Sequence, residues 1–247
     1  MKGAATALPG RDSVAPGNPV DAAILSRRSI RAFKPDAVDE SVIRHLLEVA
    51  ARAPSGTNTQ PWNAYVVSGA ARDRLCARIL EAYRSDEPHE FEYSYYPTVW
   101  RDPYISRRRK NGWSLYGLLG IEKGDREKMR DQHARNYVFF DAPVGLIFTI
   151  DRDLEIGSWL DFGMYLQSFM IAARGHGLDT CAQQAFAQYH KIIHPRLGIP
   201  ETQMIVCGMA LGYADQDAVV NRLVTEREPV EVFARFIEDF EGDTNGQ

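Results

Sequence analysis

The chain has few cysteines, no long apolar stretch and no strong excess of either charge. Its three cysteines, Cys76, Cys181 and Cys207, are odd in number and far apart, which disfavours a disulfide framework. No apolar run approaches the roughly 18–20 residues of a membrane-spanning helix. A formal net charge of −4 gives no reason to expect affinity for nucleic acid. We therefore expect a cytoplasmic protein with neither a nucleic-acid nor a membrane partner.

Two motifs that are common in enzymes are also missing. No G-x-G-x-x-G follows an expected strand, and the glycines of 208–212 indicate tight strand packing rather than a dinucleotide site. His190 and His194 are spaced four apart on an expected helix, but Lys191 stands where a zinc protease has its glutamate. The sequence therefore shows no Rossmann fingerprint and predicts no bound metal.

Hydrophobic periodicity predicts an α+β fold, because continuous apolar runs favour buried strands and 3.6-residue spacing favours helices. We expect strands near 64–68, 144–150, 180–183 and 204–211, and helices near 19–26, 40–53, 71–83, 158–176, 188–197 and 230–240. These elements predict a central mixed sheet of four to five strands surrounded by helices. Ser158 should cap the helix over 158–176, which should be central and largely buried because apolar residues cover most of its circumference.

The chain has no internal repeat and no interior linker, so residues 19–247 are expected to form one domain. Residues 1–18 are rich in alanine, glycine and proline without a continuous apolar core, which indicates a flexible extension rather than a signal peptide. The segment 84–135 contains many aromatic residues outside any regular pattern, and is expected to fold over another part of the molecule. The segment 213–247 is expected to be a C-terminal arm that packs on a partner subunit.

Basic residues crowd into the segment that follows the first expected helix. Arg27, Arg28, Ser29 and Arg31 place three guanidiniums and a hydroxyl within five residues. A guanidinium presents a fixed fork of donors that matches the geometry of phosphate. The segment therefore predicts an anion site, and a solvated basic turn is the alternative.

A second polar segment follows the expected helix over 40–53. It is uncharged and ends in Pro61-Trp62, and its candidate site residues are Pro54, Ser55, Gly56, Asn58 and Gln60. Amide side chains both donate and accept hydrogen bonds, as the edge of a heterocycle with carbonyl and N–H groups requires. A turn leading into a strand, with Trp62 in the core, is the alternative. Together with the anion site, this segment predicts a phosphorylated heterocycle such as flavin mononucleotide (FMN).

The two segments resemble those of the FMN-dependent nitroreductase family, in particular its nitrobenzoate and dinitroaniline reductase subgroup. The resemblance extends from about residue 20 to about residue 240, and the residues around Pro103 and Trp113 are similar to those of the subgroup. It implies an intertwined homodimer that binds FMN tightly and non-covalently. In such a dimer the basic segment holds the flavin phosphate, and the loop 54–62 contacts flavin across the subunit interface.

The resemblance also implies further residues at the cofactor. Arg227 matches the late basic position that completes the phosphate clamp. Gln183, Gln184 and Ala185 match the segment that crosses the flavin face and donates a backbone N–H to flavin N5. Many members have glycine at the position of Ala185 or an acid at that of Gln184, so no role is implied for the Gln184 side chain. No side chain is expected to act as a catalytic acid or base.

The activity implied by the resemblance is that of an NAD(P)H-dependent nitroreductase. NADPH or NADH is expected to deliver hydride to flavin N5, after which a nitroaromatic or quinone-like acceptor takes two electrons in a ping-pong cycle. The aromatic residues of 84–135 are expected to stack on that acceptor, or alternatively to form a local core or a dimer contact. The basic run 107–110 is expected to steer an anionic substrate or the NADPH 2′-phosphate, or alternatively to lie in solvent. Reductive dehalogenation and a non-catalytic FMN-binding redox sensor are alternative functions.

Overall fold

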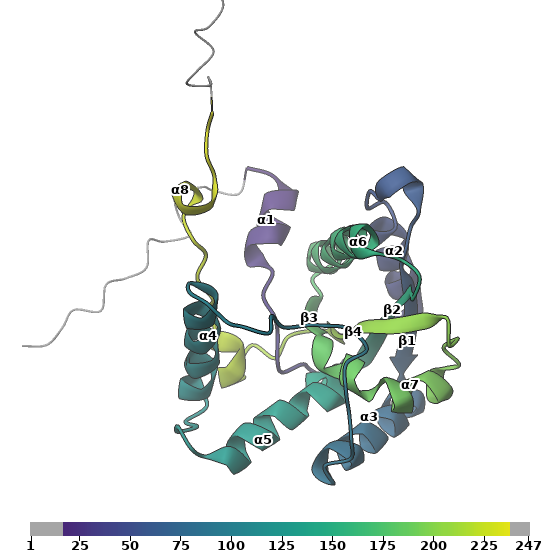
Figure 1. Cartoon of the computed structure of the whole chain (residues 1–247), viewed down its shortest axis with the longest axis vertical. Coiled ribbons are helices and arrows are strands. Elements are labelled where there is room, and N and C mark those ends of the chain that lie inside the picture. Colours follow the sequence, from purple (N-terminus) through teal and green to yellow (C-terminus); the bar gives the residue numbers. More distant parts are fainter. Residues whose placement is uncertain (1–16, 238–247) are drawn as a thin grey trace, which may run out of the picture.

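The computed structural model of the chain describes residues 17–237 and has a four-stranded sheet at its centre (Figure 1). The strands are β1 (Asn63–Ser68), β2 (Val144–Asp151), β3 (Asp179–Gln183) and β4 (Gln203–Gly212), in the spatial order β1-β2-β4-β3. Each strand pairs antiparallel with its neighbours. The sheet differs in this respect from the expected mixed sheet, because the parallel pairing found in residues 17–237 is an isolated bridge between Ser29 and Thr180.

Helices surround the sheet, as expected for an α+β fold. The α-helices are α1 (Pro19–Ser26), α2 (Glu40–Ala50), α3 (Gly69–Arg84), α4 (Tyr104–Leu118), α5 (Arg126–Ala134), α6 (Ile156–Gly175), α7 (His190–Leu197) and α8 (Val230–Phe233). Short 3-10 helices are η2 (Gly56–Asn58), η3 (Arg135–Asp141), η4 (Gln184–Tyr189) and η5 (Val219–Arg222). None of the helices in residues 17–237 is long and apolar enough to cross a lipid bilayer.

The two central strands, β2 and β4, are apolar on both faces because helices cover both sides of the sheet. Along β2, Leu146 and Phe148 pack against α2 and α6, whereas Ile147 between them packs against α3, η3 and η4. This alternation is the two-residue period of a strand, so a continuous apolar run can supply two separate cores. The predictions of buried strands near 144–150 and 204–211 are confirmed.

Two glycines allow a pair of phenylalanine rings to lie directly on the sheet. Phe139 and Phe186 stack with ring centroids 4.3 Å apart, and both are fully buried. A Cβ atom on Gly145 would lie 2.4 Å from the Phe139 ring, and one on Gly208 would lie 2.4 Å from the Phe186 ring. Any larger residue at these positions would displace a ring, so the prediction of tight strand packing around Gly208 is confirmed.

The first helix begins as predicted. The Asn18 side chain accepts a hydrogen bond from the Asp21 backbone N–H at 2.9 Å, and Pro19 occupies the first helical position. Proline fits there because its missing N–H has no partner within a helix in any case. The second helix ends at Ala50, short of the predicted 53, and residues 51–53 form a turn before Pro54.

Helix α6 corrects two expectations. It begins at Ile156 with Glu155 in the cap position, so Ser158 is not its cap. It is also not largely buried, because one side, with Phe162, packs on the sheet while Ile156 and Leu160 on another side are 85% and 71% exposed. A helix on the outside of a sheet has only one face to bury, so its remaining apolar residues lie at the surface.

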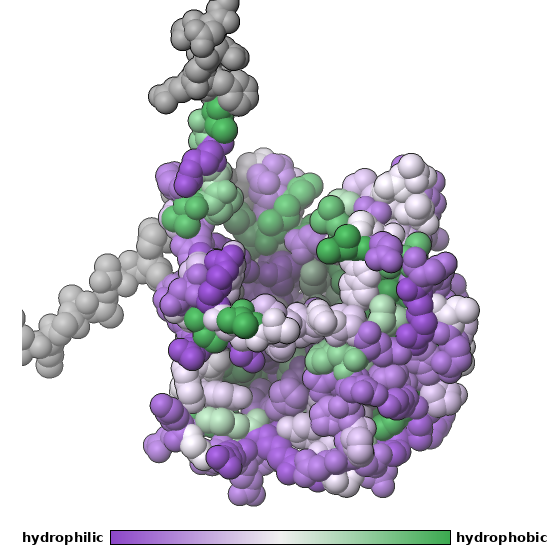
Figure 2. Space-filling model, viewed as in Figure 1, coloured by the Kyte–Doolittle hydropathy of each residue, from purple (hydrophilic) through white to green (hydrophobic). Residues whose placement is uncertain are grey.

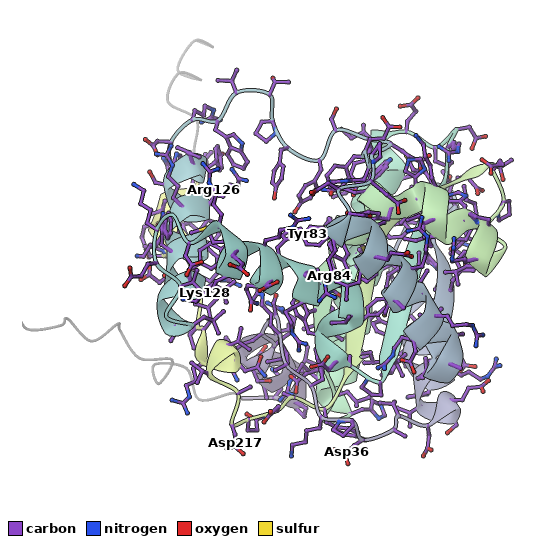
Figure 3. The ribbon with its side chains drawn as sticks, turned by 90° about the horizontal axis from the view of Figure 1, so that it is seen from below. Asp36, Tyr83, Arg84, Arg126, Lys128 and Asp217 are labelled. Carbon is purple, nitrogen blue, oxygen red and sulfur yellow. The ribbon has the colours of Figure 1, made fainter. Side chains whose placement is uncertain are left out.

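The segment 84–135 leaves the body of the molecule and returns to it. It contains α4, which has no buried residue, and α5, which leads back to η3. Figure 3 shows Tyr83 and Arg84 at the end of α3, next to α5. Arg130 of α5 fixes this corner, because its guanidinium donates to the carbonyl oxygens of Tyr83 and Arg84 at 3.0 and 2.9 Å. The segment is thus anchored at the end of α3, while α4 lies at the edge of the molecule (Figure 1).

The end of the chain is less helical than expected. Helix α8 stops at Phe233, and residues 234–237 are not helical. The rest of the helix that was expected to reach residue 240 lies outside the described residues, as does most of the expected extension over 1–18.

Candidate active site

The basic segment lies along the edge strand β3. After α1 ends, the Ile30 backbone N–H donates to the Thr180 carbonyl at 3.1 Å, and the Ile30 side chain is buried. In an extended segment alternate side chains share one face, so Arg27, Ser29 and Arg31 lie opposite Ile30. Electrostatics agrees with this placement around the buried Cys181. Burial raises the pKa of its thiol, whereas the charges of Arg31 and Arg27 and a hydrogen bond from Ser29 lower it.

Arg227 lies close to Arg27, although the two are far apart in the sequence. Burial lowers the pKa of Arg27, and repulsion by the Arg227 guanidinium lowers it further. In residues 17–237 no hydrogen bond or ion pair involves the Arg27 side chain. The hydrogen bonds of the Arg227 guanidinium are local, to Thr225 and to the Glu226 carbonyl. An anion bound by both guanidiniums would relieve their repulsion, so the pair is suited to an anionic ligand.

A buried asparagine that sequence reasoning missed holds the basic segment in place. Asn221 of η5 is 6% exposed, and its Oδ1 accepts from the Arg31 backbone N–H at 2.7 Å. Its Nδ2 donates to the Ala32 and Asp215 carbonyls, both at 2.8 Å. Arg28 reaches the other way, with Nη1 donating to the Asn221 carbonyl at 2.9 Å. Arg28 therefore points away from the face shared by Arg27, Ser29 and Arg31. The other N–H donors of its guanidinium do not take part in the bond to Asn221.

The segment 183–185 lies where β3 ends and η4 begins, on the same sheet edge as the basic segment. Gln183 is buried, and its Nε2 donates to the Asn136 carbonyl at 2.8 Å. Its Oε1 is also buried but has no hydrogen-bond partner in residues 17–237. Gln184 and Ala185 are partly exposed. An unpartnered buried acceptor beside an accessible backbone turn is suited to a polar ligand, because the ligand can supply the missing donor.

A side chain of α6 forms a hydrogen bond to the polar loop 54–60. The Gly56 backbone N–H donates to Oδ2 of Asp161, a nearly buried carboxylate that sequence reasoning also missed. Ser55 Oγ accepts from the Gln60 backbone N–H at 3.0 Å. Asn58 and Gln60 have left-handed backbones, with φ of 62° and 48°, and their side chains are exposed. The loop therefore presents its amides at the surface rather than to the core.

One chain does not bring the loop and the basic segment together. Helix α6 contacts α1 on one side and η2 on the other, so the two candidate segments lie on opposite sides of it (Figure 1). An open apolar groove of about 460 Å³ lies on α6 beside Pro54, and its other lining residues are Trp159, Leu160, Gly163, Met164 and Gln167. Figure 2 shows further hydrophobic surface over α1, where Val20 is 60% exposed. The surface between the two segments is thus largely apolar.

In the part of the chain that the structure describes, no group of three His, Cys, Asp or Glu side chains is arranged to hold a metal ion. The His190 ring lies 3.3 Å from Glu92 rather than facing a common ligand with His194.

Comparison with known proteins shows the family of the chain. The sequence matches the Nitroreductase family over residues 24–213. It is 40% identical over 221 residues to a chloronitrobenzene nitroreductase of Comamonas testosteroni, covering 89% of this chain and 97% of that protein. It is 41% identical to a 4-nitrobenzoate reductase of Pseudomonas putida, covering 88% and 95%.

Solved structures agree at the level of the fold. The FMN-dependent nitroreductase NfnB from Mycobacterium smegmatis in complex with NADPH has a TM-score of 0.85 and 32% identity, covering 89% of this chain and 98% of that one. The FMN- and NADPH-dependent NfnB from a Sphigopyxis strain has a TM-score of 0.84 and 35% identity, covering 88% and 98%. This chain belongs to the nitroreductase family.

Proposed function

We propose that the protein is an FMN-dependent NAD(P)H oxidoreductase that reduces nitroaromatic compounds. Support comes from relatives named for chloronitrobenzene, nitrobenzene and 4-nitrobenzoate reduction, each about 40% identical over most of the chain. The observation that carries the proposal is the basic segment held along the edge strand β3, where Arg27 and Arg227 are near enough to repel each other. Such a pair, with Ser29 and Arg31 on the same face, fits the phosphate of FMN.

The residues present fit the cofactor at both of its ends. Arg27, Ser29, Arg31 and Arg227 would hold the phosphate, while Arg28 secures the segment through Asn221 and can add its remaining donors. At the other end, the Oε1 atom of Gln183 has an unused acceptor position, and the backbone of Gln184 and Ala185 follows it. This backbone would place a donor at the edge of the ring, where negative charge develops on reduction.

The ring loop is proposed to come from a second copy of the chain. Within one chain α6 separates Pro54–Gln60 from Arg27–Arg31, so a complete site requires a homodimer in which each subunit supplies one part. The exposed apolar residues Val20, Ile156 and Leu160 are consistent with such an interface. Ser55, Gly56, Asn58 and Gln60 would then face the ring bound by the partner subunit.

The protein's own contribution is binding, orientation and exclusion of water. Bound FMN would supply the two-electron chemistry, accepting reducing equivalents from NADPH or NADH and passing them to a nitroaromatic or quinone-like compound. We propose that residues 84–135 form an aromatic lid over that acceptor, and that residues 213–237 form part of a C-terminal arm. We also propose that residues 19–247 form one domain and that the protein acts in the cytoplasm.

The visible spectrum of the purified protein is the first test. We expect a bound yellow flavin that NADPH or NADH bleaches anaerobically and that 4-nitrobenzoate reoxidises. A flavin that neither nucleotide bleaches would indicate a redox sensor instead. Turnover of iodotyrosine without turnover of nitroaromatics would indicate a dehalogenase. A colourless protein that cannot be loaded with FMN would overturn the proposal.

Arginine substitutions test the phosphate clamp directly. Arg27→Ala and Arg227→Ala should each weaken FMN binding roughly 10- to 100-fold, because each removes charge-assisted hydrogen bonds. Arg44→Ala is a matched control, since Arg44 is an exposed residue of α2 whose partner is Glu40. It should leave FMN affinity unchanged. If all three variants bound FMN as tightly as the wild type, Arg27 and Arg227 would not belong to the phosphate site.

A further inference from the structure

Helix α4 packs loosely on the rest of the molecule, yet it forms ion pairs with the segment that contains Arg227. None of its residues is buried. Two of its cations instead reach the C-terminal segment: Arg107 Nη2 lies 2.9 Å from Glu228 Oε1, and Lys110 Nζ lies 2.5 Å from Glu226 Oε2. Figure 1 shows α4 beside this segment, drawn in yellow. The contact therefore joins the inserted helix to residues on either side of Arg227.

The geometry of this contact sets the direction of Arg227. Residues 223–229 form no helix, and successive side chains of an extended segment point to opposite sides. Glu226 and Glu228 pair with α4, whereas the Arg227 guanidinium between them bonds to Thr225 and the Glu226 carbonyl and is near enough to Arg27 to repel it. Arg107 and Lys110 are three residues apart and share one helix face, which matches the spacing of the two glutamates.

The contact also removes a local competitor for Arg227. Glu226 and Glu228 are its direct neighbours, and a free carboxylate beside a phosphate-binding guanidinium would pair with it and repel the phosphate. With both carboxylates paired to α4, the hydrogen bonds of the Arg227 guanidinium within residues 17–237 are local, to Thr225 and to a backbone carbonyl. A third basic residue, Arg108, lies over the rings of Tyr96 and Trp100 at 4.8 and 4.9 Å, which fixes α4 to the aromatic loop.

We infer that Arg107 and Lys110 are positioning residues for the cofactor: they hold Glu226 and Glu228 against α4 and so present Arg227 to the phosphate of FMN. This inference rests on the proposed FMN site. It gives α4 a role in cofactor binding although none of its residues belongs to the clamp. Two of the four cations in the run 107–110 are thereby assigned to the protein's own carboxylates rather than to an anionic substrate.

Titration of the FMN-depleted protein with FMN, followed by flavin fluorescence, tests this role. Lys110→Glu should weaken FMN binding roughly three- to ten-fold, because it replaces an exposed ion pair by repulsion from Glu226. Lys110→Arg should keep the affinity of the wild type. Arg109→Glu is the matched control: it makes the same change of charge on the same helix, and in residues 17–237 the Arg109 side chain takes part in no hydrogen bond or ion pair.

Repeating the Lys110 substitution in an Arg227→Ala protein distinguishes an effect through Arg227 from a general effect of charge. If Lys110 acts through Arg227, then Lys110→Glu should have no further effect on FMN affinity in an Arg227→Ala protein. An equal loss in both backgrounds, or an equal loss for Arg109→Glu, would overturn the inference, since either would show an unspecific effect of charge. A wild-type protein that binds no FMN would instead contradict the proposed function itself.

Discussion

Aromatic residues serve different purposes in the centre of the molecule and in the segment 84–135. In the centre, Phe139 and Phe186 are fully buried and stack on each other above two glycines of the sheet. In the segment, Tyr96, Tyr104 and Trp113 are between 44% and 49% exposed. The first group is stabilised by removal of apolar surface from water, whereas the second keeps much of that surface available.

The two regions are also held by different forces. The central strands are covered on both faces by apolar side chains. Helix α4 is held by ion pairs to the C-terminal segment and by guanidiniums over aromatic rings, contacts that are individually weak and sensitive to salt. The difference suggests that the sheet determines the fold, while α4 can adjust to ligands at small cost. Comparable substitutions in both regions can test this.

The largest difference is expected for loss of an aromatic ring. Phe186→Ala should destabilise the protein by about 3–5 kcal/mol, because it leaves a cavity beneath β4. This corresponds to a decrease in melting temperature on the order of 10 °C. Trp113→Ala on α4 should cost less than about 1 kcal/mol, because the ring is already 44% exposed. Thermal unfolding of both variants measures this, and similar losses would show that α4 belongs to the same cooperative core.

An intermediate effect is expected at the junction between the sheet and the basic segment. Asn221→Ala removes the partners of the Arg31 N–H and of two carbonyls, which should cost about 1–3 kcal/mol of stability. FMN affinity should fall with it, because Arg31 loses its backbone support. Asn111→Ala, on the exposed surface of α4, should change stability by no more than about 0.5 kcal/mol. Denaturant unfolding with FMN titration distinguishes the two, and an unaffected Asn221→Ala protein would refute this role.

The same contrast explains what the sequence could and could not predict about the fold. The strands β2 and β4 are recognisable because an uninterrupted apolar run permits few other structures. The burial of α6 was predicted wrongly, because apolar residues around a helix do not reveal whether the chain itself or another molecule covers them. Helix α4 gave no signal at all, since its basic residues and scattered aromatics lack the spacing of a buried face.

Prediction of the site was limited in a similar way. The motif of Arg27–Arg31 could be identified because several guanidiniums within five residues are uncommon without an anion. The proximity of Arg227 followed from resemblance to a family rather than from spacing. Asn221 and Asp161 could not be identified, because a single polar residue shows its importance only when folding buries it beside particular backbone groups. The ion pairs of α4 with Glu226 and Glu228 depend on tertiary structure for the same reason.

A titratable contact lies at another junction between the two regions. Glu92, in the segment 84–135, lies 3.3 Å from His190 at the start of α7 and 2.7 Å from Arg152. Burial lowers the pKa of His190, and the charges of Lys191 and His194 act in the same direction. Glu92 and Glu90 oppose them by raising it, but the net effect keeps the imidazole neutral in the folded protein.

The smallest predicted effect is therefore a dependence of stability on pH. The unfolded chain binds a proton at His190 near pH 6.5, whereas the folded protein resists protonation until a lower pH. The free energy of unfolding should thus decrease as the pH falls from about 6.5 towards the pKa of His190 in the folded protein. Below that pKa the contribution of His190 should stay constant. His190→Gln removes the titrating group and should flatten this slope, while His45→Gln on the exposed face of α2 controls for the loss of a histidine. Denaturant unfolding between pH 7.5 and pH 5 measures both, and an unchanged slope in His190→Gln would show that protonation at this junction does not contribute to stability.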